Sequence, residues 1–200
     1  MKKYALILVL CFAITNIDAQ TKKTKKLISE IEGQWEQDDN GNITYTRIIE
    51  DLNLPKDKIY TRALEYFTYN YGDGSSVIQI EDKEKGLIIG KGVYKNVHIG
   101  NSIIAYIFDT WHILRIDVKE NRARIMLTLT NYDFTVSGGD TPDSTRKEVI
   151  SQNYPINPKG RIRNQFGKAF YASHKKAQLT LLAIEKTLKE GSTFKKKSDW

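Results

Sequence analysis

The spacing of apolar residues along the chain predicts two helices. Between Pro55 and Gly72, apolar side chains recur every four residues, as on a helix with one buried face. That stripe consists of Ile59, Ala63, Phe67 and Tyr71, widened by Tyr60 and Leu64. A longer helix is predicted over residues 165–190, where an apolar arc lies opposite a line of lysines. The arc consists of Phe166, Phe170, Ala177, Leu181, Ile184 and Leu188, and the lysines are Lys168, Lys175 and Lys186.

Alternating and continuous apolar runs predict five strands. The first covers residues 43–50 and follows the Asn40-Gly41 turn signal. Four more are predicted over residues 77–82, 87–98, 103–119 and 122–130. Gly90 and Gly92 indicate a bulge or a close backbone approach in the second of these. The last strand alternates apolar and polar residues, so one sheet face is expected to be buried and the other solvated.

The order of these elements predicts the fold class. Strand, helix, four strands and helix is typical of an α+β protein with an antiparallel sheet. The long C-terminal helix is then expected to pack on one sheet face. Residues 137–163 carry glycines and prolines and are predicted to be a loop.

The N-terminus has the pattern of a cleavable export signal. Lys2 and Lys3 precede an apolar run over residues 4–14, and the small residue Ala19 provides a cleavage site. The run is shorter than the roughly 20 residues of a membrane-spanning helix. We therefore expect export to the periplasm or cell envelope, and no transmembrane segment in the mature chain. The predicted organisation is a signal peptide at 1–19, a polar segment at 20–34, a single α+β domain at 35–191 and a basic tail at 192–200.

The only cysteine, Cys11, lies inside the predicted signal peptide. It stands in the middle of the apolar run and follows Leu10, so we expect it to be removed rather than lipidated. Cleavage would leave no disulfide, no cysteine nucleophile and no cysteine metal ligand. About 180 mature residues are enough to bury a substantial core without such links.

The net charge of +7 is concentrated near the C-terminus. From residue 156 to 200, eleven Lys or Arg residues stand against three acidic residues. Such a segment is typical of a solvated helix face, and also of a site for an acidic partner or anionic lipid headgroups. Because the chain is expected outside the cytoplasm, we do not expect a nucleic-acid partner.

Four segments resemble one known family. They are Ile43–Ile49, Ile59–Ala63, Gly86–Gly92 and Val118–Arg124. In order and residue type they are similar to the bacterial family called domain of unknown function 4468, from Trp35 to Asp133. The resemblance implies export, a TATA-binding-protein-like (TBP-like) fold and no assigned activity. The same architecture includes helix-grip proteins, which enclose an apolar ligand between a curved sheet and a long C-terminal helix, although a fold does not determine a function.

No pattern of residues in the sequence indicates a catalytic, metal or cofactor site. The three histidines, His98, His112 and His174, lack the spacing of a zinc site. There is no Gly-x-Ser-x-Gly nucleophile elbow, and Gly90-Lys91-Gly92 lies within a predicted strand rather than in a phosphate-binding loop. We therefore name no catalytic residue, no metal and no cofactor.

Two groups of residues are candidates for binding sites. Outward-facing cations on the last predicted hairpin form a candidate basic surface: Arg115, Lys119, Arg122 and Arg124. Asp117 and Glu120 are the acids that would neutralise this surface across the hairpin. Aromatic residues form a candidate ligand cavity: Tyr45, Tyr60, Phe67, Tyr106, Phe108 and Phe170. The alternative is that these aromatic residues fill the core.

Three functions remain open at this point. The first is a non-enzymatic binding or interaction module of the cell envelope, with an envelope protein as its partner. The second is a carrier that holds a small apolar or amphipathic ligand between the sheet and the C-terminal helix. The third is a hydrolase. A closed apolar cavity larger than about 300 Å³ under the helix would favour the carrier, whereas a filled core would argue against it.

Overall fold

The computed structural model of the chain describes residues 21–71, 77–100, 104–138, 142–159 and 162–191. The elements are β1 (Glu36–Gln37), β2 (Ile43–Ile49), α2 (Lys56–Asn70), β3 (Ile78–Asp82), β4 (Leu87–Gly100), β5 (Ala105–Lys119), β6 (Arg122–Ser137), β7 (Ser144–Val149), the 3-10 helix η1 (Ile150–Gln152) and α4 (Arg163–Glu190). Residues 21–29 are also helical. The predicted α+β class is confirmed, with further elements before β2 and after β6.

The strands form one antiparallel sheet in the order β1-β2-β6-β5-β4-β3, and β7 pairs with β6. β6 is long enough to pair with two strands in succession. Its first half pairs with β2, from Ala123 to Leu129, and its second half pairs with β7, from Asn131 to Val136. A shift of register in β4, after Tyr94, inserts an irregularity that bends the long strands.

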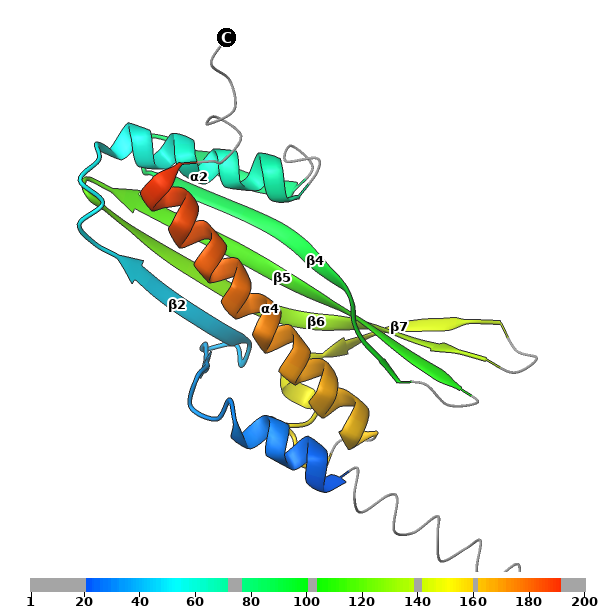
Figure 1. The fold of residues 1–200 in the computed structure, drawn as a ribbon. Coiled ribbons are helices and arrows are strands. Elements are labelled where there is room, and N and C mark those ends of the chain that lie inside the picture. Colours follow the sequence, from blue (N-terminus) through cyan, green and yellow to red (C-terminus); the bar gives the residue numbers. More distant parts are fainter. Residues whose placement is uncertain (1–20, 72–76, 101–103, 139–141, 160–161, 192–200) are drawn as a thin grey trace, which may run out of the picture.

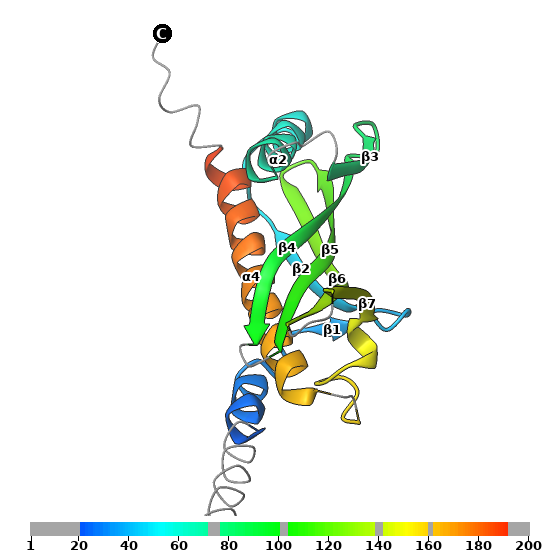
Figure 2. The ribbon, with the colours of Figure 1, turned by 90° about the vertical axis from the view of Figure 1, so that its right-hand side faces the viewer.

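Both long helices lie on one face of the sheet. Figure 1 shows α4 running obliquely across the strands and α2 lying across one end of the sheet. Figure 2 shows the two helices on the same side of the strands. Neither of them covers the opposite face of β2, β6, β5 and β4. We call this the open sheet face; its exposed side chains include Ile48, Ile113 and Arg124.

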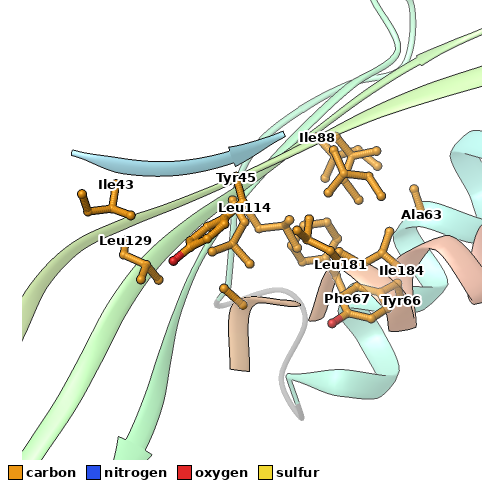
Figure 3. Packing of buried hydrophobic residues seen from close by; sticks show 14 of the residues in the cluster. Ile43, Tyr45, Ala63, Tyr66, Phe67, Ile88, Leu114, Leu129, Leu181 and Ile184 are labelled. Atoms are coloured by element: carbon orange, nitrogen blue, oxygen red, sulfur yellow. The ribbon is translucent and has the colours of Figure 1, made fainter. Parts of the chain in front are cut away.

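The core fills the space between the sheet and the two helices. Figure 3 shows Tyr45 and Leu114 of the sheet in one cluster with Phe67 of α2 and Leu181 of α4. The whole apolar arc predicted for α4 is buried. Fully burying one such side chain contributes about 1.5–3 kcal/mol, so this interface is the main source of stability.

Long side chains and the β5–β6 hairpin cap the two helices. In α2, Arg62 donates from Nη1 to the carbonyl oxygens of Leu188 and Lys189, at 2.6 and 2.8 Å, and so satisfies the C-terminal end of α4. In the hairpin turn, Glu120 accepts the backbone N–H of Lys56 at 3.0 Å, at the start of α2. Both contacts join elements that are far apart in the sequence.

The helix at residues 21–29 was not predicted. Its many lysines obscure any apolar pattern. Thr24 is its one buried residue, Ile28 packs against the core while partly exposed, and Ile31 is buried just beyond its end. Gly167 of α4 makes the approach possible, since a Cβ at that position would lie 2.5 Å from Thr24 Cγ2. The contact with α4 at this point is therefore made by Thr24, a small polar residue. A search for periodic large apolar residues does not detect such a contact.

The prediction of a loop over residues 137–163 was wrong in part. β7 and η1 lie inside this range. Five of the six residues of β7 are exposed and three are charged, so no apolar alternation marks the strand. It forms because its backbone pairs with the second half of β6, a partner that sequence periodicity does not reveal.

No helix in the described part of the chain is both long and apolar enough to cross a membrane. The predicted signal peptide at 1–19 and the predicted basic tail at 192–200 lie outside the described residues.

The two glycines of β4 allow α2 to approach the sheet closely. A Cβ at Gly90 would overlap the ring of Phe67, and a Cβ at Gly92 would lie 2.5 Å from Tyr71 Cε1 and 2.8 Å from His112 Cε1. The close approach predicted for this strand is therefore confirmed. The rings of Phe67 in α2 and of Tyr71, the residue that follows α2, occupy the space that side chains on β4 would otherwise take.

We expect Gly90→Ala to lower the free energy of unfolding by about 1–3 kcal/mol, because the new methyl group overpacks against Phe67. Urea denaturation measures the change. In a Phe67→Leu background the same substitution should cost less, since the smaller side chain leaves room. Equal costs in both backgrounds would show that the Phe67 ring does not fill this space.

A buried histidine joins α2 to the centre of the sheet. His112 is fully buried, its Nε2 lies 2.8 Å from the Tyr71 hydroxyl, and the Tyr94 ring stacks on it at 4.1 Å. Burial lowers its pKa to about 4. Burial also lowers the pKa of His98 and of His174. The charges of Lys168 near His98 and of Lys175 near His174 lower these two pKa values further.

Acid should therefore destabilise the fold through His112. The unfolded chain binds a proton below a pKa of about 6.5, whereas the folded chain does so only near 4, so stability falls as the pH drops through this window. Between pH 7 and pH 5, the native chain should lose roughly 2 kcal/mol more than a His112→Gln variant. Denaturation curves across that range measure the difference. Parallel pH profiles for the two proteins would contradict the assignment.

Candidate functional site

The six aromatic residues of the candidate ligand cavity are mostly core residues. Five are buried, and Tyr106 is half-buried; the buried ones are Tyr45, Tyr60, Phe67, Phe108 and Phe170. Phe108 has the Phe134 and Phe166 rings at centroid distances of 4.9 and 5.1 Å, and the Phe170 ring meets Trp35 at 5.7 Å. These aromatic side chains thus pack against other protein side chains at the positions where a ligand would have to contact them. This packing favours the core-filling alternative that the sequence left open.

The candidate basic surface, by contrast, is brought together on the open sheet face. Lys119, Arg122 and Arg124 converge at the end of the β5–β6 hairpin, around a concave site of about 230 Å³. Ile48, Asp117 and Ala123 complete its lining. We call this site the cationic cavity. Arg115 lies at its border, because it shares Asp117 with Arg124.

Asp117 holds two of the guanidinium groups. Arg115 donates to it from Nη2 at 2.7 Å and from Nε at 3.0 Å, and Arg124 donates from Nε and Nη2 at 3.1 and 3.0 Å. Burial acts to raise the pKa of Asp117, but the hydrogen bonds from Arg115 and Arg124 outweigh it and hold the pKa below its usual value. One carboxylate therefore orients two cations and neutralises only one of them.

The other acid expected to neutralise the surface is engaged elsewhere. Glu120 binds the backbone of Lys56 at the start of α2 instead of a hairpin cation. Lys119 and Arg122 are exposed and form no ion pair with any residue that the structure describes. The cationic cavity thus keeps a positive surplus, and its two free cations are available to a partner.

Comparison with known proteins gives the family. Residues 45–133 match the family model described as "Domain of unknown function (DUF4468) with TBP-like fold". This part of the chain is a DUF4468 domain. It spans most of β2, α2, β3, β4, β5 and the first part of β6, and it includes all four residues of the candidate basic surface. The resemblance seen in the sequence is confirmed.

Two solved structures share the fold. A TBP-like protein from Parabacteroides distasonis is 19% identical, with a TM-score of 0.55, and the match covers 78% of this chain and 97% of that one. A DUF4468 family protein from Bacteroides ovatus is 12% identical, with a TM-score of 0.50 and coverage of 77% and 91%. No curated protein matches the chain. At these identities the structures support the fold and do not assign a function.

A second hollow lies beside β2, on the helix-covered side of the DUF4468 domain. It has a volume of about 220 Å³ and lies between residues 33–36, β2 and α4. Its lining includes Trp35, Tyr45, Arg47, Gln178 and Leu181. We call it the edge cleft. Tyr45 is the one member of the candidate ligand cavity that borders it.

The outer face of α4 carries the exposed part of the basic C-terminal segment. Lys175 and Lys186 are exposed, as predicted from the helical wheel, and Lys168 is half-buried. Leu179 and Leu182, which also fall outside the apolar arc, are exposed as well. In Figure 2, α4 lies on one side of the strands. The cationic cavity lies on the open sheet face, which is the other side.

No cluster of three or more His, Cys, Asp or Glu side chains that could hold a metal ion occurs among the described residues of the DUF4468 domain and its flanks. Asp38, at the start of the Asn40-Gly41 turn, instead accepts the backbone N–H groups of Asn40 and Asn42, at 3.0 and 2.8 Å. It shapes the turn between β1 and β2.

Because the Asp117 pairs are partly exposed, Asp117→Asn should lower the free energy of unfolding by no more than about 1 kcal/mol. Asp82→Asn, which breaks an exposed pair with Lys85, is the matched control and should show no measurable change. Chemical denaturation at low and high salt measures both. A loss above about 3 kcal/mol for Asp117→Asn would mean that the fold depends on this pairing as on a buried ion pair.

Proposed function

We propose that this chain is a non-enzymatic interaction module that binds an acidic partner at the cationic cavity. The observation that carries the proposal is the imbalance of charge there. Four cations, Arg115, Lys119, Arg122 and Arg124, lie around one carboxylate, Asp117, which pairs with only Arg115 and Arg124. Two of the four form no ion pair within the described part of the chain. An acidic group on a partner would neutralise these two cations.

The chemistry of the cavity favours carboxylates. Arginine presents parallel N–H donors that match a carboxylate in a bidentate pair, and such charge-assisted bonds are stronger than neutral ones. Asp117 already orients Arg124 by such contacts, which lowers the entropy lost when a partner binds. Ile48, 62% exposed, gives the cavity an apolar wall against which the stem of an acidic side chain can pack.

The size of the cavity favours a macromolecule over a free small molecule. At about 230 Å³ it is smaller than the roughly 300–1,000 Å³ of typical small-molecule sites. It is also open to the sheet face, so it cannot bury most of a free ligand. One or two acidic side chains of a larger partner fit such a site, with the surrounding open sheet face available for further contact.

We further propose that the binding takes place outside the cytoplasm. This part of the proposal is supported by the basic start, apolar run and small cleavage-site residue in residues 1–19. A partner in the envelope would then be an acidic protein. The carrier alternative has no comparable support, because the aromatic residues it needs are packed against one another.

Replacing Arg122 and Arg124 together by Glu should weaken binding of a labelled oligoglutamate peptide at least about tenfold, because two of the three cations that line the cavity reverse sign. Lys175→Glu with Lys186→Glu is the matched control: it changes the net charge equally, but on the outer face of α4. It should weaken binding by no more than about twofold. Fluorescence anisotropy at several salt concentrations measures both. An equal loss in the two double variants would show diffuse attraction and refute a site at the cavity.

A further inference from the structure

β2 is an edge strand for most of its length. β1 pairs with it only through Glu36↔Thr44 and Gln37↔Ile43. From Tyr45 onward, no strand in the described ranges pairs with its outer side, while β6 occupies its inner side as far as Ile49. In Figure 1, β2 lies at the margin of the sheet with no strand beyond its second half.

The backbone groups on this edge can be assigned. Asp38 donates its N–H to the carbonyl oxygen of Asn42, so the peptide groups of Asn42 point toward β1. Alternate residues of an antiparallel strand point the same way. The N–H and C=O groups of Thr46 and Ile48 therefore point outward at the open edge, where no described residue satisfies them.

Two hollows flank this edge, one on each side of the sheet. Ile48 borders the cationic cavity on the open sheet face. Tyr45 and Arg47, which point to the other face, border the edge cleft together with Leu181 of α4. A strand placed beside β2 would send alternate side chains to the two faces, and so into these two hollows.

The edge of β2 also lacks the features that usually prevent pairing. Its only charged residue, Arg47, is held by Glu185 of α4 at 2.8 Å. β7, another edge strand, carries three charged residues, Arg146, Lys147 and Glu148. Proteins usually protect an edge strand with charges, prolines or a cover. An unprotected segment with an exposed isoleucine at position 48 is typical of a site used for strand addition.

We propose that the edge of β2 at Thr46–Ile48 accepts an extended segment of an acidic partner as an additional strand. The acidic character of the segment rests on the function proposed above. Its backbone pairs with Thr46 and Ile48, its acidic side chains pass Ile48 to reach Arg124 and Arg122, and its alternate side chains enter the edge cleft. Backbone pairing supplies affinity, and the two hollows supply specificity.

A second copy of this chain fits the edge less well than an acidic segment. Pairing β2 with itself would bring together two chains of net charge +7. It would also place two cationic cavities on one continuous sheet face, each with a positive surplus. An acidic partner removes this repulsion instead of adding to it.

The test uses a short peptide that alternates glutamate and threonine, added to the purified chain and followed by amide hydrogen exchange in NMR spectra. We expect a dissociation constant tighter than about 1 mM and exchange at the amides of Thr46 and Ile48 slowed about tenfold or more. The same peptide with its backbone N-methylated at alternate residues, in the register that pairs with β2, should bind at least about tenfold more weakly. Its charge is unchanged, so this loss isolates backbone pairing.

Arg122→Glu with Arg124→Glu separates this inference from the proposed function. Weaker binding in that variant, without any protection of Thr46 and Ile48 in the native chain, would support the cavity and overturn strand addition. Protection that persists in the variant at unchanged affinity would support strand addition and overturn the acidic cavity.

Three further outcomes would overturn the inference. The first is no binding of the alternating peptide at about 1 mM. The second is equal binding of its N-methylated form. The third is protection of the two amides that rises with protein concentration in the absence of peptide, which would identify a second copy as the occupant.

Discussion

The structure depends on the packing of aromatic and aliphatic side chains between the sheet and the helices on one of its faces. Phe166, Phe170, Leu181 and Ile184 of α4 are buried there against the strands, and Phe67 of α2 fills the space above Gly90. Burial of apolar surface is the dominant favourable term in folding, and this is where the chain buries it. Because the space between the sheet and the helices is filled, we assign the proposed recognition to the open sheet face and to the free edge of β2.

The β5–β6 hairpin links this core to the cationic cavity. At its turn, Asn121 takes a positive φ of 61°, and Glu120 reaches back to the start of α2. The acid that would otherwise neutralise Lys119 and Arg122 is thereby used to cap a helix. The surplus of positive charge on the open sheet face is thus a consequence of how the fold is held together. Asp117 adds to the arrangement by fixing two guanidinium groups at once.

Local periodicity predicted the elements that bury a regular apolar face. The arc of α4 was correct at every position from Phe166 to Leu188, and the alternation of β6 gave the outward row that includes Arg122 and Arg124. β7 was missed because its residues are polar and only its pairing with β6 makes it a strand. The helix at 21–29 was missed because Thr24, rather than a large apolar residue, lies against α4.

The candidate sites were predictable to different degrees, because local alternation is visible in the sequence and long-range contacts are not. Strand alternation places Arg115, Asp117 and Arg124 on one face, so the basic surface follows from the sequence. The open edge of β2 does not follow from the sequence. Contacts between residues far apart in the chain decide which strand lies outermost in the sheet. The aromatic residues of the candidate cavity have the same composition whether they line a cavity or fill a core. Only their mutual distances, such as 4.9 Å between Phe108 and Phe134, distinguish the two.

The central claim is that the space between the sheet and the two helices is a filled core and that recognition takes place at the open sheet face and the edge of β2. Native mass spectrometry of the chain purified from its own host tests this most directly. The account predicts that the protein appears at the mass of the polypeptide alone, or with a bound polypeptide partner that high salt removes. A retained apolar small molecule, released only when the protein unfolds, would contradict it.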